Sequence, residues 1–315
     1  MSKKTSIGGQ AVLEGVMMKG PDKIAVCVRK TSGEIVSDIE NIKPSSKRNW
    51  FLKLPIIRGC IAFFESMIIG IKTLMKSADM YDLEEEDPNY KPSKVDELIE
   101  KIFKNKDAVI YFSLVIALVF SIGLFFIVPG IIFNLLSSVI QSRIVLNLVE
   151  GIIRIGIFLS YITLVSFNKD IQRVFQYHGA EHKSIFTYEQ GEELTVENVK
   201  KYPRFHPRCG TSFLMFVMII SILVFSVIPK EIGGIAIDGF VIIIAKLLLL
   251  PVISGISYEI IKWAGRSDAK LIALLSKPGM WLQRITTREP DESQLEVAIC
   301  SLKAVIPENG EEDNW

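Results

Sequence analysis

The sequence has few of the residues that stabilise secreted, cross-linked domains. Its 315 residues include only four cysteines, which are far apart and form no CxxC pair: Cys27, Cys60, Cys209 and Cys300. This argues against a disulfide scaffold and favours reduced thiols in a cytosolic setting. The first residues, MSKKTSIGGQAVLEG, lack an apolar core of signal-peptide length, so no cleaved targeting signal is expected.

The sequence also lacks an excess of positive or negative charge. The sequence carries 36 Lys and Arg residues against 35 Asp and Glu, a formal net charge of +1, so composition gives no specific nucleic-acid signal. Hydrophobic residues make up 49% and the mean hydropathy is +0.34, yet 23% of the residues are charged. Because both kinds are abundant, we expect apolar segments within a lipid bilayer and charged residues in the connections.

Four apolar stretches are long enough to cross the roughly 30 Å hydrocarbon core of a bilayer as helices. They predict a mainly α, multi-pass membrane protein with spans at 108–128, 144–167, 211–229 and 239–263. Lysine and arginine are scarce in the connections after the first and third spans, and frequent at 168–210 and near both ends of the chain. The positive-inside rule therefore predicts that 168–210 and both termini face the cytosol.

Smaller elements are expected outside these spans. Residues 1–53 carry a cytosolic β-hairpin signal at 23–40, with two short strands around a glycine-containing turn. Residues 54–80 predict an amphipathic interfacial helix, with a fifth span as the alternative, because charges recur there every seven residues at Arg58, Glu65, Lys72 and Asp79. We also expect an acidic linker and short helix at 81–107, cytosolic or interfacial helices at 264–306, and a disordered tail at 307–315.

Three charged residues interrupt the predicted spans. Glu150 and Arg154 are four residues apart in the second span, and Lys246 lies at a similar depth in the fourth. A Glu150–Arg154 or Glu150–Lys246 ion pair would relieve the cost of a lone charge in a bilayer, about 2.5–3.5 kcal/mol on insertion scales. The cluster predicts either a clamp that fixes helix packing or part of an ion path.

All three histidines of the chain lie in one short stretch. His178 and His182 in HGAEH are four residues apart, so a helix would place both imidazoles on one face, as in many metal sites. Glu181 stands between them, in the H-x-x-E-H order of the inverted zinc peptidases. HPRCGTS adds His206 and Cys209 just before the third span, where a helix N-terminus would favour a thiolate.

These residues predict a site for a divalent transition metal, for which zinc fits the donor types. Two designs are open. His178, His182, His206 and Cys209 together would make a closed, structural site, whereas three histidines with an open position and Glu181 as general acid/base would make a hydrolytic one. The alternative without a metal is a set of hydrogen bonds at the membrane interface.

Four motifs give the chain a family resemblance: GGQAVLEGVMMKGP, HGAEHK, HPRCGTSFL and PGMWLQRITTREPDESQLEVAI. Together they resemble the YqhQ-type bacterial membrane proteins, a largely uncharacterised family labelled predicted metal-dependent enzymes, over residues 7–306. The resemblance implies a bacterial cytoplasmic membrane and a suspected metal-dependent activity. It also draws attention to Glu14, a motif residue of unknown role, and to the segment TTREP.

Three functions follow as hypotheses. The first is a metal-dependent hydrolase with a cytosol-facing site, acting on a membrane-associated substrate. The second is a non-enzymatic scaffold or biogenesis factor with a structural metal, whose terminal segments bind a cytosolic or membrane protein partner. The third is an ion or metal transporter that uses the charges within the spans.

Overall fold

The computed structural model describes residues 4–42, 49–81, 106–228, 231–232, 235–236, 239–266 and 270–307. The acidic linker and short helix expected at 81–107, and the tail expected at 307–315, lie almost entirely outside these residues. The chain divides into two compact units. Unit 1 combines residues 1–83, 162–221 and 249–315, and unit 2 combines 84–161 and 222–248.

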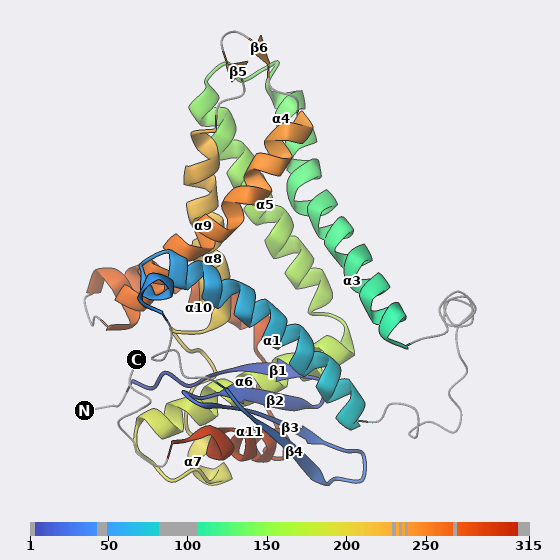
Figure 1. The fold of residues 1–315 in the computed structure, drawn as a ribbon, viewed down its shortest axis with the longest axis vertical. Helices are drawn as coiled ribbons and strands as arrows, with labels where there is room; N and C mark the ends of the chain where they lie inside the picture. The colour runs from blue at the N-terminus through green and yellow to red at the C-terminus, as the bar shows by residue number, and fades with distance from the viewer. Residues whose placement is uncertain are drawn as a thin grey trace. The chain divides into compact units, whose positions relative to one another are not determined.

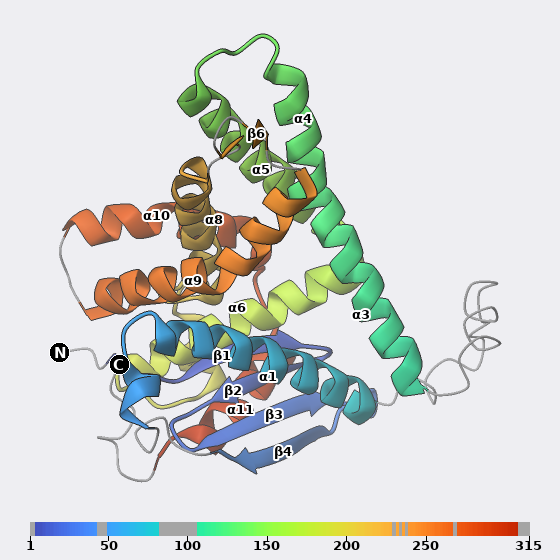
Figure 2. The same ribbon diagram turned by 45° about the horizontal axis from the view of Figure 1, so that its top comes forward.

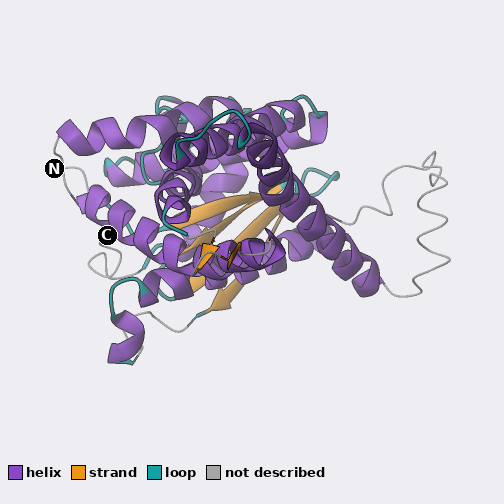
Figure 3. Ribbon diagram, turned by 90° about the horizontal axis from the view of Figure 1, so that it is seen from above, coloured by secondary structure: helices purple, strands orange, loops and turns teal. Residues whose placement is uncertain are grey.

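Unit 1 contains a four-stranded antiparallel sheet, whose strands are orange in Figure 3, and the strand order is β1-β2-β3-β4. Its strands are β1 (Gly8–Val12), β2 (Gly15–Lys19), β3 (Lys23–Arg29) and β4 (Ile35–Asn41). The predicted hairpin at 23–40 is β3–β4. The preceding hairpin was missed because its two-residue turn is Leu13–Glu14 rather than an Asn-Gly type, and Glu14 itself takes the positive φ of 46°.

Helices cover both faces of the sheet. α6 (Lys169–Glu189) and α11 (Glu292–Val305) pack on one face, and α1 (Ile57–Tyr81) packs on the other (Figures 1 and 2). Successive strand residues point to opposite faces, so β2 and β3 are buried on both sides. Val16, Met18, Ala25 and Cys27 join the core with α6 and α11, whereas Met17, Ile24, Val26 and Val28 belong to the core on the side of α1.

The helix expected at 54–80 is α1, and it is not among the candidate membrane spans of the described residues. It turns its small and polar residues inward: Gly59, Thr73 and Ser77 are buried, and the Ser77 hydroxyl accepts the Leu13 N–H at 3.2 Å. Its large apolar side chains are exposed instead, including Phe64, Met67, Ile68, Ile71 and Leu74. This distribution fits the predicted interfacial position, which stays a prediction.

The remaining helices include the apolar ones. A continuous run consists of α3 (Lys106–Ile122), a π-helical turn, η3 (Gly123–Ile127), and α4 (Val128–Leu136). The others are α5 (Arg143–Val165), α7 (Val196–Lys200), α8 (Gly210–Ser226), α9 (Gly239–Arg266) and α10 (Lys270–Thr286). A 3₁₀ turn, η2 (Trp50–Lys53), precedes α1, and the short strands β5 (Glu231–Ile232) and β6 (Ile235–Ala236) lie between α8 and α9.

Three of the described helical segments are long and apolar enough to cross a membrane: Phe112–Leu136, Val145–Val165 and Gly239–Trp263. The first extends eight residues beyond the predicted end at 128, because the helix continues through the π-helical turn and Pro129. The span expected at 211–229 is the shorter apolar helix α8, which ends at Ser226. The prediction of a mainly helical protein is confirmed, and the count of four spans stays a prediction.

Candidate metal centre

Helix α6 carries both histidines of HGAEH. This helix is separate from the second predicted span, because α5 ends at Val165 and α6 begins at Lys169. Asn168 caps the new helix by accepting the N–H groups of Asp170 and Ile171. Within α6 the spacing of four residues places His178 and His182 on one face, with ring centroids 4.4 Å apart.

Two backbone carbonyls orient these imidazoles. The Nδ1 of His178 is 2.8 Å from the Thr286 oxygen, and the Nδ1 of His182 is 2.5 Å from the Arg204 oxygen. A carbonyl can only accept, so each Nδ1 carries the proton and donates. The Nε2 atoms are then the ring nitrogens that remain for a metal, an arrangement shared by metal-binding histidines.

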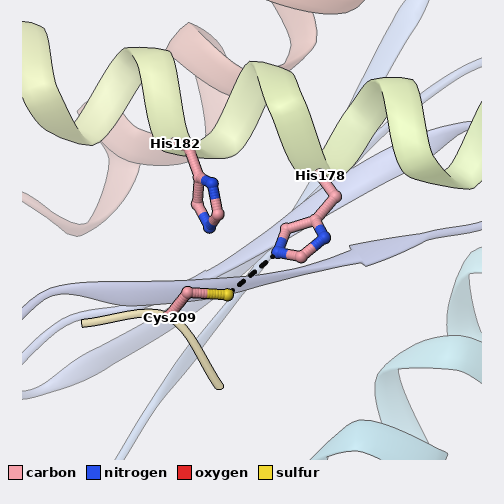
Figure 4. A group of neighbouring side chains, drawn as sticks. All are labelled: His178, His182 and Cys209. Atoms are coloured by element: carbon pink, nitrogen blue, oxygen red, sulfur yellow. Dashed lines mark hydrogen bonds between the residues drawn. The ribbon is translucent and has the colours of Figure 1, made fainter. Parts of the chain in front are cut away.

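Cys209 completes a three-residue cluster, called here the His–Cys cluster, of His178, His182 and Cys209 (Figure 4). Cys209 directly precedes α8, and its sulfur is 3.2 Å from the Nε2 of His178. One ligand atom from each of the three residues lies within 4.8 Å of the other two. The Nε2 of His182 is buried without a hydrogen-bond partner among the described residues. A buried, unpaired nitrogen beside a sulfur is costly unless a ligand accepts its lone pair.

Cys209 and His178 shift each other's pKa values in opposite directions. Burial opposes ionisation of Cys209, but the charges of His182 and His178 outweigh it and lower the pKa of the thiol well below its ordinary value. Burial likewise lowers the pKa of His178, but the adjacent Cys209 outweighs this and raises that pKa to about 9. These directions favour a thiolate at Cys209 beside a protonated His178, whose Nε2 proton a metal would displace on binding.

Glu181 lies beside the cluster with a fixed orientation. Its Oε1 accepts the N–H of Gly9 at 2.9 Å, and its Oε2 is 3.9 Å from the Nε2 atoms of both His178 and His182. A side chain on Gly9 would meet the Met17 oxygen at 2.7 Å and the Glu181 Cγ at 2.9 Å. Glycine in the first motif thus allows β1 to approach the carboxylate that stands next to the cluster.

His206 is buried nearby but takes other partners. Its ring centroid is 5.7 Å from that of His182, yet its Nε2 faces Glu189 at 3.4 Å and its Nδ1 accepts the Arg208 N–H at 3.3 Å. Burial, and then the charge of His182, lower its pKa to about 4, so it is neutral. The structure does not bring His206 into the three-residue cluster, and its role as a metal ligand stays a prediction.

Sequence reasoning missed two buried residues that hold this region. Gln283 is fully buried, and its side chain accepts the His206 N–H at 2.7 Å and donates to the His206 oxygen at 2.8 Å. Glu189 accepts the Thr5 N–H at 2.9 Å and pairs with the Arg208 guanidinium. A lone glutamine in α10 and a glutamate at the end of α6 have no spacing signal that could have identified them.

The TTREP segment reaches the cluster through a close backbone contact. A side chain at position 179 would stand 2.2 Å from the Arg288 oxygen, so only glycine allows this segment to cross α6. The Arg288 N–H donates to the Phe175 oxygen at 2.8 Å. This crossing brings the Thr286 carbonyl to His178, which explains why HGAEH contains a glycine and why TTREP belongs to the same site.

Glu14 joins the first hairpin to α6. Both of its carboxylate oxygens pair with the Arg173 guanidinium, and its Oε2 accepts the Tyr177 hydroxyl at 3.2 Å. Tyr177, which makes the second of these contacts, directly precedes His178 in the chain. The geometry indicates a structural tie that keeps β1 and β2 against α6.

The three charged residues expected within the spans form a separate cluster in unit 2, called here the charge cluster. Glu150 Oε1 accepts from Arg154 at 2.7 Å and from Lys246 at 2.5 Å, and all three residues are buried. Arg154 Nε also donates to the Phe125 oxygen at 3.1 Å. The cavity beside the cluster has a volume of about 10 Å³, space for one water molecule at most.

These features describe a mainly helical protein with apolar helices of membrane-spanning length and a buried His–Cys cluster. The chain belongs to the family described as "Protein of unknown function (DUF1385)", whose model matches residues 54–308. It is similar to "Uncharacterized protein YqhQ" of Bacillus subtilis (strain 168), with 35% identity over 304 residues that cover 95% of this chain and 92% of the relative. No solved structure matches. The resemblance to the YqhQ-type family is therefore confirmed.

Proposed function

We propose that the protein is a multi-pass protein of a bacterial cytoplasmic membrane whose His–Cys cluster binds zinc on the cytosolic side. The observation that carries the proposal is the shared orientation of the two imidazoles. Both Nδ1–H groups donate to backbone carbonyls, the Nε2 of His178 lies 3.2 Å from the Cys209 sulfur, and the Nε2 of His182 is buried without a partner among the described residues. Two imidazoles and a thiolate suit zinc, which takes nitrogen and sulfur ligands at about 2.0–2.3 Å.

We further propose that the site is hydrolytic and acts on a membrane-associated substrate. Three protein ligands leave a fourth position open, at which bound zinc supplies Lewis acidity. Glu181 is suited to hold and move a proton there, since Oε1 is fixed by Gly9 while Oε2 is equally distant from both Nε2 atoms. The exposed apolar face of α1 supports a position at the membrane surface, where such a substrate would be met.

A structural zinc site in a scaffold or biogenesis factor is the second candidate. It is favoured by the burial of the cluster, since His182 is only 1% exposed and Glu181 only 5%. In this case Glu181 or His206 would supply the fourth ligand. Ion transport receives less support, because the charges of the charge cluster are satisfied by one another and the adjacent cavity is small.

One pair of variants separates these candidates. Wild type, Glu181→Gln and a control with an exposed carboxylate changed, Glu197→Gln, are purified in detergent and their zinc content is measured. Each is also tested for rescue of a deletion strain. A hydrolytic site predicts that Glu181→Gln keeps zinc and loses rescue, while Glu197→Gln keeps both.

Other results would redirect the proposal. Loss of zinc in Glu181→Gln would make Glu181 a ligand of a closed site. Retention of both zinc and rescue would favour the structural candidate, and wild-type protein without a metal would refute both zinc proposals.

A further inference from the structure

An open pocket of about 530 Å³ in unit 1 lies next to the backbone that holds the His–Cys cluster. Its wall includes Arg204 and the end of α10 with the residues that follow it. The same stretches provide the two carbonyls, of Arg204 and Thr286, that orient His182 and His178. The same two backbone segments therefore line the pocket and orient the histidines of the cluster, although different side chains face each of them.

The lining of this pocket is basic. Three guanidinium groups, from Arg204, Arg284 and Arg288, are set against one carboxylate, that of Glu289. Glu289 is itself engaged, since it pairs with Lys183 and lies 3.8 Å from the Arg204 Nη1. The rest of the lining is mostly amide and hydroxyl groups, so the pocket favours an anion.

Two of the arginines have buried donors that are not used. The Nε atoms of Arg204 and Arg288 are buried without a hydrogen-bond partner among the described residues. Other contacts hold the groups in position: Arg288 Nη2 donates to the Ser166 oxygen at 3.2 Å, and the Arg204 guanidinium lies 5.0 Å from the Phe205 ring centre. A ligand rich in acceptors would remove the cost of these unpaired N–H groups.

Phosphate is the anion that fits these donors best. Arginine forks bind phosphate oxygens in a bidentate way, and three guanidinium groups from two segments in one pocket wall match a group with several oxygens better than a two-oxygen carboxylate. The volume is in the range of small-molecule sites and exceeds what a bare phosphate fills, so a larger organic group would accompany it.

The pocket also adjoins the end of a candidate span. Thr163 and Ser166 line it, and the apolar helix Val145–Val165 ends between them. If that helix crosses a bilayer, this is the level at which lipid phosphates lie. We propose that the pocket binds the phosphate group of an organic phosphate ester, carried by a lipid headgroup or by a soluble molecule. Its role as a substrate pocket rests on the proposed function, whereas the binding itself does not.

The test uses the full chain in non-ionic detergent. Retention of phosphatidic acid is compared with that of phosphatidylcholine by native mass spectrometry, and binding of glycerol 3-phosphate is measured by calorimetry. The variant Arg204→Gln/Arg284→Gln removes two pocket charges and leaves the backbone carbonyls in place. The matched control, Lys200→Gln/Lys201→Gln, removes two exposed charges at the end of α7. Zinc content is measured in every preparation.

We expect wild type to prefer phosphatidic acid or glycerol 3-phosphate, and the pocket variant to bind that ligand at least roughly tenfold more weakly, with the control unchanged. Preference for phosphatidic acid would identify a lipid headgroup as the ligand of the pocket. Preference for glycerol 3-phosphate would identify a soluble phosphate ester. Equal binding by the pocket variant and wild type, or an equal loss in the control, would overturn the proposal. Phosphate binding in protein without zinc would support this pocket and refute the zinc site, so the two failures are distinguishable.

Discussion

The two buried polar clusters of this protein differ in how their groups are satisfied. In the charge cluster of unit 2, Arg154 and Lys246 share one oxygen of Glu150, and the polar groups find their partners within the cluster and its helix backbone. In the His–Cys cluster of unit 1, the backbone fixes one nitrogen of each imidazole, the second nitrogen of His178 contacts the Cys209 sulfur, and that of His182 has no partner among the described residues. The first cluster is complete by itself, whereas the second has capacity for a ligand.

This difference indicates different roles. A satisfied ion cluster fixes how helices pack, and removing one partner leaves the others buried and uncompensated. A cluster with an unpaired, oriented lone pair bears a cost that the fold tolerates when binding offsets it.

Loss of one cluster ligand should abolish metal binding. In His182→Ala we expect zinc to fall from about one per chain to below a tenth, because two ligands cannot hold it against competition. Lys246→Met, which disturbs the other cluster, should keep its zinc. Elemental analysis of both purified variants measures the effect. Equal zinc content in His182→Ala and wild type would mean that the metal sits elsewhere.

Removal of the shared carboxylate should destabilise unit 2 without affecting the metal. Glu150→Met leaves Arg154 and Lys246 buried without a counter-charge, at an expected cost of about 3–5 kcal/mol in the free energy of unfolding. Thermal and chemical unfolding in detergent measures it. The triple variant Glu150→Met/Arg154→Met/Lys246→Met should recover most of the loss, since apolar side chains of similar size replace the whole cluster. A triple variant as unstable as the single one would contradict a clamp.

Much of the site could be predicted from local sequence. The spacing of four residues was sufficient to expect His178 and His182 on one face of a helix, because helix periodicity fixes this pair. The approach of Cys209 was an expectation that spacing alone did not fix, since residues 190–209, including α7, separate α6 from α8. The nearby His206 could not be separated from them, because only its contacts with Glu189 and Arg208 show where its nitrogens point.

The rest depended on contacts between distant segments. No periodic pattern indicates that Gly9 would donate to Glu181, 172 residues later, or that Arg288 would cross α6 at Gly179. The fold had the same limit: apolar length predicted the helices, whereas the hairpin β1–β2 has three glycines and a Leu-Glu turn that local propensity does not favour.

The crossing of α6 by the TTREP segment gives a finer test of the His–Cys cluster. In Gly179→Ala the new methyl group would meet the Arg288 oxygen at 2.2 Å, so the segment must move. We expect a loss of about 1–3 kcal/mol in unfolding free energy, and weaker zinc binding as the Thr286 carbonyl shifts from His178. Gly156→Ala in α5 is the matched control.

Apart from the backbone of its own helix, no heavy atom of the described residues lies within 4 Å of a Cβ added at the control position. Its helical environment predicts a neutral effect or a gain of up to about 1 kcal/mol, with zinc unchanged. Unfolding curves and a zinc competition titration compare the two variants. A silent Gly179→Ala would show that the close approach is not required for the site.

The smallest effect is expected at Glu14, the motif residue whose role the sequence left open. Its partner Arg173 is half exposed, with 49% of its side chain accessible, so solvent screens the pair. Glu14→Gln should therefore cost about 1 kcal/mol or less in unfolding free energy and leave zinc content unchanged. Arg173→Gln should cost the same, and the double variant little more, because both remove one interaction. If Glu14→Gln keeps its stability and its zinc but fails to rescue a deletion strain, Glu14 acts in the chemistry, and the structural tie between hairpin and helix is not its function.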